Sequence, residues 1–137
     1  MKDHYVHART CVYNVHYHIV WCVKYRRKVL SDEKAAFLKE EFSRIAKKNG
    51  YSVAECEVGL MDHVHVFVDA APKFSISTIV KQLKGESGFS LFHRYPELKD
   101  VLRNGTFWNG SYFVETIGST SEENVKAYIQ RQQNVFR

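Results

Sequence analysis

The sequence has few cysteines, few prolines and no long apolar run, and each of these shortages excludes a class of protein. The three cysteines, Cys11, Cys22 and Cys56, are widely spaced and form no CxxC pair, which indicates neither a disulfide framework nor a zinc knuckle. No apolar segment approaches the ~20 residues that a membrane-spanning helix needs. Residues 1–4 also lack the apolar region of a signal peptide. We therefore expect a cytosolic protein that does not bind a membrane.

The composition is that of one compact domain. The chain has 137 residues, of which 45% are hydrophobic, 14% are aromatic and only two are proline, and this length suffices for one domain with a substantial core. The formal net charge of +5 is compatible with a polyanionic partner, although many basic proteins bind no nucleic acid. Because the chain lacks the GxxxxGK(S/T) loop that cradles nucleotide phosphates, we expect no nucleotide cofactor.

The spacing of apolar residues predicts alternating strands and helices. Ser31 is a suitable N-cap for a first helix, which the pair Lys47 and Lys48 with Gly50 should end. Residues 51–58 and 60–68 should pair as a hairpin. The expected elements are a strand at 11–23, the helix between Ser31 and Gly50, strands at 51–58 and 60–68, a helix at 75–84, a strand at 107–117 and a last helix at 121–135. Two glycines at 85 and 88 weaken the helix at 75–84, and Pro96 must end any continuation of it.

This order of elements predicts the fold class. The succession β-α-β-β-α-β is the ferredoxin-like arrangement, an α+β fold with an antiparallel sheet and two helices on one face. We expect a single domain at 1–137 that consists of this core at 1–117, a hinge at 118–120 and an appended C-terminal helix at 121–135. The appended helix carries a tyrosine.

The strand at 60–68 holds the most informative pattern in the chain. Because side chains alternate across a strand, His63 and His65 lie on one face, and Val64, Val66 and Val68 lie on the other. The valine face belongs in a core. Two imidazoles side by side can bind a metal ion or a phosphate, since neutral imidazole is a common metal ligand.

A second histidine pair competes with the first. His16 and His18 also share one face of a strand, and by spacing alone they are an equally good metal pair. The basic residues that follow favour instead a contact with DNA or packing on the sheet. Asp62 should lie on the opposite face from His63, which suggests that it supports the site or the fold rather than binding the metal.

Basic residues form two candidate nucleic-acid contacts. A run of cations around one aromatic ring ends the first strand, and it could grip phosphates while the ring stacks on a base; the alternative is a solvated strand end. Two lysines one turn apart share a face of the second helix. The residues concerned are Lys24, Tyr25, Arg26, Arg27 and Lys28 in the run, and Lys81 and Lys84 on the helix.

Tyr128 and Gln132 are four residues apart and therefore share a face of the expected last helix. Alone, such a tyrosine is most simply a surface residue. Together with the histidine pair it suggests a nucleophile, because a tyrosine hydroxyl can form a covalent intermediate and a metal ion can polarise the phosphate under attack. Gln132 could offer its carbonyl oxygen as a third ligand.

These motifs together resemble a known family. The segment from Asp62 to His65, the sequence Tyr128-Ile129-Gln130-Arg131-Gln132 and the first strand at 17–30 are similar to those of the HUH single-tyrosine transposases of small bacterial insertion sequences. The resemblance covers essentially the whole chain in the same order. The HxH motif is not specific by itself, and neither is the YxxxQ motif. The two motifs at this separation, together with the basic first strand, are specific for this family.

The resemblance implies a function and a role for each matching residue. His63, His65 and Gln132 would bind a divalent cation, Mg²⁺ or Mn²⁺, and Tyr128 would attack single-stranded DNA at hairpin-marked element ends to leave a 5′-phosphotyrosine. The enzyme would be a metal-dependent transesterase that needs no ATP to rejoin strands. The resemblance further implies a homodimer that exchanges tyrosine helices, with Gly118 at the base of the helix, and a place in the prokaryotic cytoplasm with the nucleoid.

Three other functions remain compatible with these residues. The chain could be a domesticated relative that processes chromosomal hairpin repeats. It could also be a non-catalytic ferredoxin-like binder of single strands, although the aromatic-glycine signature of RNA-recognition modules is absent. The third possibility is a metal sensor that uses one of the HxH pairs and in which Tyr128 has only a structural role.

Overall fold

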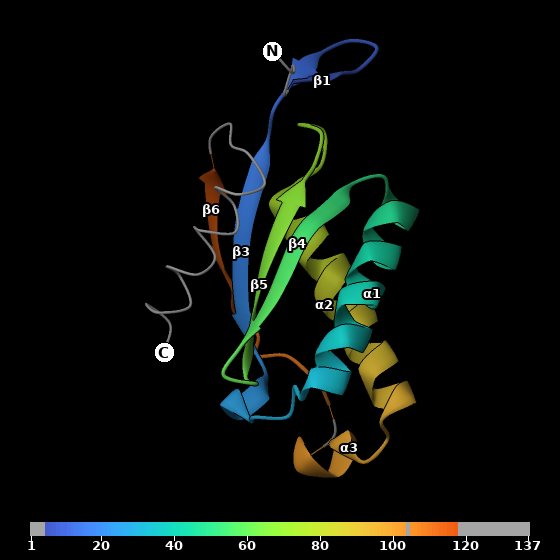
Figure 1. The fold of residues 1–137 in the computed structure, drawn as a ribbon, viewed down its shortest axis with the longest axis vertical. Coiled ribbons are helices and arrows are strands. Elements are labelled where there is room, and N and C mark those ends of the chain that lie inside the picture. Colours follow the sequence, from blue (N-terminus) through green and yellow to red (C-terminus); the bar gives the residue numbers. More distant parts are fainter. Residues whose placement is uncertain (1–4, 104, 118–137) are drawn as a thin grey trace.

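The computed structural model describes residues 5–103 and 105–117. The expected hinge at 118–120 and tyrosine helix at 121–135 lie outside these residues. The elements are β1 (Val6–His7), β2 (Val12–Tyr13), β3 (His16–Cys22), a 3₁₀ turn (Lys24–Arg26), α1 (Asp32–Asn49), β4 (Ser52–Gly59), β5 (His63–Asp69), α2 (Ile76–Arg94), α3 (Leu98–Val101) and β6 (Phe113–Ile117) (Figure 1).

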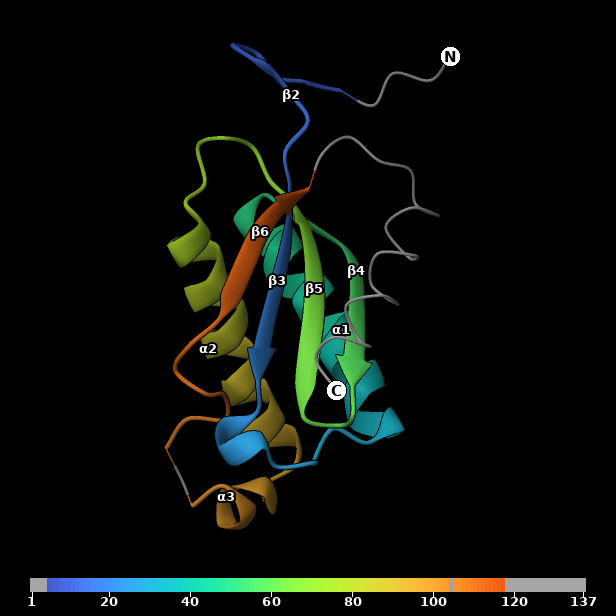
Figure 2. The same ribbon diagram turned by 90° about the vertical axis from the view of Figure 1, so that its left-hand side faces the viewer.

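Within the described residues, four strands form the main sheet in the order β4-β5-β3-β6, and every neighbouring pair is antiparallel. Helices α1 and α2 cover one face of this sheet (Figures 1 and 2). From β3 to β6 the chain runs β-α-β-β-α-β, which confirms the expected ferredoxin-like fold. β1 and β2, which pair separately from the main sheet, were not predicted as a hairpin.

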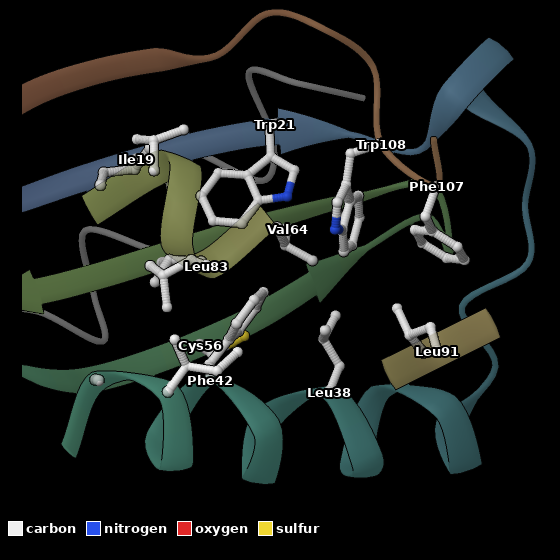
Figure 3. Packing of buried hydrophobic residues seen from close by; sticks show 14 of the residues in the cluster. Ile19, Trp21, Leu38, Phe42, Cys56, Val64, Leu83, Leu91, Phe107 and Trp108 are labelled. Carbon is white, nitrogen blue, oxygen red and sulfur yellow. The ribbon is translucent and has the colours of Figure 1, made fainter. Parts of the chain in front are cut away.

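The core lies between the sheet and the two helices (Figure 3). The valine face of β5 is fully buried there, as predicted, and meets Ile19 and Trp21 of β3. Trp21 packs edge-on against Phe42 of α1, with ring centroids 5.7 Å apart. Burial of these apolar side chains fixes which face of β3 and β5 turns toward the helices, and so places the opposite side chains of both strands together on the other face.

The ends of α1 agree with the sequence. Ser31 Oγ accepts a hydrogen bond from the Lys34 amide, at 3.5 Å, and Asp32 and Glu33 occupy the first turn. Gly50 ends the helix in the left-handed conformation, with φ = +90°, which glycine adopts without steric cost.

The second helix continues beyond Lys84 towards Pro96, the residue that has to end any continuation. α2 continues through Gly85 and Gly88 and ends at Arg94, just before Pro96. Gly88 is needed for packing, because a Cβ there would lie 3.3 Å from the Cβ of Phe107. The glycine thus allows a close approach instead of ending the helix.

The expected strands at 11–23 and 107–117 are both shorter in the structure. The first divides into β2 and β3. The last begins only at Phe113, since Phe107 and Trp108 turn into the core instead (Figure 3). Trp108 Nε1 donates to Ser87 Oγ of α2 at 2.9 Å, which ties this segment to the helix layer. Among the described helices, none is both long and apolar enough to cross a membrane.

Candidate metal centre

The two central strands bring three histidines together on the sheet face away from α1 and α2. In the β3–β5 register, Val20 lies opposite His65 and Cys22 opposite His63, while His18 lies two residue pairs beyond Val20, opposite Phe67 and on the same face. The side chains of His18, His63 and His65 are all buried. The predicted HxH pair therefore lies on one face, and His18 of the competing pair lies beside it.

Asp62 orients the first histidine of the pair. His63 Nδ1 and Asp62 Oδ1 are 2.7 Å apart, and because an ionised carboxylate only accepts, Nδ1 carries the proton and Nε2 carries the lone pair. Burial raises the pKa of Asp62, but the His63 hydrogen bond and the nearby charges of Arg26 and Lys28 outweigh it and leave the pKa below its usual value. Asp62 therefore supports His63, as expected.

His18 orients the second histidine. His65 Nδ1 lies 2.9 Å from His18 Nε2, and His18 Nδ1 lies 3.2 Å from Glu115 Oε1 on β6. Burial, with lesser contributions from the charges of His18 and His63, lowers the pKa of His65 to about 3. His65 is therefore neutral at physiological pH, which is the form that binds metals.

The second HxH pair does not converge on one point. His16 binds Asp69 and Asn14 through its two ring nitrogens, whereas both nitrogens of His18 are bonded to His65 and Glu115. Neither histidine thus presents a lone pair toward the other. The ring nitrogens of His16 and His18 are thus engaged with other side chains, which makes His63 and His65 the better candidate pair.

A glycine keeps space beside His63. Gly59 of β4 lies directly opposite His63 in the sheet, and a Cβ at Gly59 would stand 2.3 Å from His63 Nε2. Only a residue without a side chain leaves this nitrogen room. The chemistry of the two imidazole donors fits a metal ion. Within residues 5–103 and 105–117, however, no group of three or more His, Cys, Asp or Glu side chains suits a metal, so these residues offer two nitrogen ligands and not a complete set.

The predicted DNA contacts separate into two groups. Lys24 Nζ donates to the Leu102 carbonyl at 3.0 Å, and Lys84 Nζ donates to the carbonyls of Asn109 and Ser111. These two lysines therefore fasten the 102–111 segment to the rest of the fold. Of the residues predicted to contact DNA, those that are exposed at the surface are Tyr25, Arg26, Arg27, Lys28 and Lys81.

Two of the exposed basic residues, Arg26 and Lys28, lie close to His63. Arg26 and Lys28 reach Asp62, with nitrogen–oxygen distances of 3.6 and 3.4 Å, so they flank the carboxylate that orients His63. Tyr25, with 59% of its surface exposed, and Arg26 have φ values of 59° and 51°. Such left-handed backbone is costly for residues other than glycine and is often found at functional sites.

Three supporting residues were not predicted as part of a site: His18 as a partner of His65, Glu115 and Gly59. The only available signal was the second HxH itself, since Glu115 and Gly59 reach the site through strand pairing. Tyr128 and Gln132 lie outside the described residues, so their predicted roles remain predictions.

Comparisons with known proteins give the family. A family model described as "Transposase IS200 like" matches residues 11–132. The ISDra2 transposase TnpA of Deinococcus radiodurans is 42% identical over 125 residues, which cover 91% of this chain and 89% of that protein. The transposase for insertion sequence element IS200 of Salmonella typhimurium is 32% identical over 120 residues, 88% of this chain and 78% of that protein.

Solved structures agree with the sequence relatives. A crystal structure from Deinococcus radiodurans, described as a transposase, superposes with a TM-score of 0.75 at 38% identity and covers 96% of this chain and 98% of that chain. A REP-associated tyrosine transposase bound to a REP hairpin has a TM-score of 0.56 at 12% identity, over 93% of this chain and 68% of that one, which shows a shared fold. The chain belongs to the IS200-like transposase family and is an insertion-sequence transposase.

Proposed function

We propose that this transposase is a metal-dependent transesterase that cleaves and rejoins single-stranded DNA through a 5′-phosphotyrosine at Tyr128. The observation that supports it most is the arrangement of His63 and His65. Both rings are buried on one sheet face, and the Nδ1 atom of each is hydrogen-bonded to a neighbouring side chain, Asp62 for His63 and His18 for His65.

A divalent cation, Mg²⁺ or Mn²⁺, would be held by His63, His65 and Gln132. When bound, it supplies positive charge that polarises the scissile phosphate. Two imidazoles and an amide are softer than the all-oxygen set that Mg²⁺ prefers, so manganese tolerates these ligands better, and phosphate oxygens of bound DNA would add the hard ligands that magnesium requires.

Tyr128 performs the covalent step in this proposal. Its hydroxyl oxygen attacks the phosphorus, and the bond from phosphorus to the 3′ oxygen breaks as the new bond forms. The phenolic proton is lost, and the departing 3′ oxygen takes up a proton to become a free hydroxyl. Because one phosphodiester replaces another, rejoining to a different 3′-hydroxyl needs no nucleotide hydrolysis.

Single-stranded DNA with hairpins at the element ends is the proposed substrate. The REP-associated transposase that shares this fold is bound to a hairpin. This chain presents Tyr25, Arg26 and Arg27 at the surface, and Arg26 lies 3.6 Å from Asp62. Guanidinium groups would contact phosphates while the tyrosine ring stacks on an unpaired base. We also propose a homodimer that exchanges tyrosine helices and acts on DNA in the prokaryotic cytoplasm.

The test uses labelled single-stranded oligonucleotides from the flanks of the gene, incubated with protein and Mn²⁺ or Mg²⁺ and separated on a denaturing gel. We expect a heat-stable, metal-dependent protein–DNA adduct that is lost in Tyr128→Phe, while that variant still binds the DNA. An adduct that persists in Tyr128→Phe would refute the nucleophile. Tight binding with no adduct in any metal would instead favour a non-catalytic single-strand binder.

A further inference from the structure

His18 lies at the centre of the histidine cluster and yet is not placed to bind a metal, since each of its ring nitrogens is bonded to a neighbouring side chain. We infer that Glu115, His18 and His65 form a three-strand relay that fixes the tautomer of His65, so that His18 and Glu115 are positioning residues for metal binding. This inference rests on the metal-binding role proposed above for His65.

The relay follows from the strand register. Glu115 of β6 lies directly opposite His18 of β3, and on the other side of β3 His65 of β5 lies two residue pairs along from His18, on the same face. The planes of the His18 and His65 rings differ by only 5°. Consequently one hydrogen-bonded chain crosses three adjacent strands and ends on a carboxylate that is 37% exposed.

The direction of each hydrogen bond is set from the Glu115 end. A carboxylate only accepts, so His18 Nδ1 donates to it and His18 Nε2 is left with a lone pair. That lone pair accepts from His65, so His65 Nδ1 carries the proton and His65 Nε2 carries the lone pair. In the opposite tautomer of His65, the lone pairs of His65 Nδ1 and His18 Nε2 would face each other across 2.9 Å.

The two histidines of the pair therefore have matching support. Asp62 bonds His63 directly, whereas Glu115 acts on His65 through His18. Histidines that bind metals usually donate their second ring N–H to a carboxylate or another acceptor, and loss of that acceptor typically weakens metal binding about 10–100-fold.

Packing is the competing explanation for His18. Its ring stacks on Phe67, with centroids 4.7 Å apart, and meets Phe113 edge-on at 6.2 Å. If packing were its whole role, phenylalanine at position 18 would preserve the site. If the relay is its role, a side chain with both an acceptor and a donor is required, which glutamine supplies and phenylalanine does not.

Calorimetric titration of the DNA-free protein with Mn²⁺ separates these explanations. We expect His18→Phe to weaken Mn²⁺ binding about 10–100-fold and His18→Gln to restore it to within a few-fold of the parent. Phe67→Leu, which alters the stacking but keeps the relay, should bind like the parent. Thermal melts establish that each variant is folded. Parental affinity in a folded His18→Phe would overturn the inference.

Nitrogen NMR of the metal-free protein gives a second readout that does not depend on metal binding. We expect the His65 ring to be protonated at Nδ1 in the parent and to become a mixture of tautomers in Glu115→Ala, whose helices and sheet should persist because the carboxylate is partly exposed. An unchanged His65 tautomer in Glu115→Ala would overturn the relay. Separately, parental Mn²⁺ affinity in His65→Ala would refute the proposed metal site, whatever the relay does.

Discussion

Replacement of Gly59 by alanine should damage the proposed metal centre without replacing any residue that is proposed to bind the metal. The new Cβ would stand 2.3 Å from His63 Nε2 and 2.5 Å from Cε1. An ordinary contact begins near 3.4 Å, so the shortfall is about 1.1 Å. The ring has to move by roughly that distance, because Gly59 and His63 are held opposite each other by the β4–β5 pairing.

A movement of this size has two consequences. It strains the hydrogen bond to Asp62, whose 2.7 Å length leaves little room for a 1 Å shift, and overpacking of this kind costs about 1–3 kcal/mol of stability. It also displaces a proposed metal ligand, and a misplacement of about 1 Å in an active site can cost on the order of 100-fold in rate. We expect Gly59→Ala to weaken Mn²⁺ binding at least about tenfold and to slow cleavage about 100-fold.

Calorimetry with Mn²⁺, a cleavage assay on single-stranded DNA and a thermal melt measure these effects together. Gly85→Ala is the matched control, because a Cβ at Gly85 of α2 meets nothing within 4 Å and should stabilise the helix by about 0.5–1 kcal/mol. If Gly59→Ala is folded and keeps parental Mn²⁺ affinity and cleavage, the space beside His63 is not a requirement of the site, and the reasoning fails.

Two further predictions concern pH and salt. The pKa of His65 is about 3 in the folded protein and about 6.5 in the unfolded chain, so between these pH values the unfolded chain binds one more proton. The free energy of unfolding should therefore decrease as the pH is lowered from about 6.5 to about 3, by up to about 1.4 kcal/mol per pH unit. Melts of parent and His65→Asn should show a shallower slope in the variant, and equal slopes would contradict this. Arg27→Ala should weaken single-stranded DNA binding and reduce the salt slope by about 0.7, whereas Lys47→Ala on α1 should not; an unchanged slope in Arg27→Ala would remove Arg27 from the phosphate contacts.

Local patterns in the sequence were sufficient for the fold. Alternation in the strand at 60–68 placed the valines in the core, and the signals at Ser31 and Gly50 delimited α1 to within a residue. The same local rules failed where distant packing decides. The role of Gly88 in α2 could not be predicted, because its close approach to Phe107, nineteen residues away, has no local signature.

The candidate site could be predicted only in part, for a related reason. His63 and His65 are two residues apart, so their shared face follows from alternation. The residues that orient and accommodate them do not share this proximity: His18 and Glu115 are 97 positions apart, and they meet because β3 lies between β5 and β6. Their contact depends on strand order and register, which a single sequence specifies weakly.

The alternation of β5 also constrains how this chain can tolerate insertions and deletions. Leu60 and Met61 form a tight left-handed connection, with φ values of 50° and 62°, directly before the histidine strand. A change of one residue there that shifted the pairing would exchange the two faces, so that imidazoles entered the apolar layer and valines left it. Core and site would be lost together. Length changes in the separate β1–β2 hairpin avoid this coupling, because they leave the pairing of β5 and both of its faces in place.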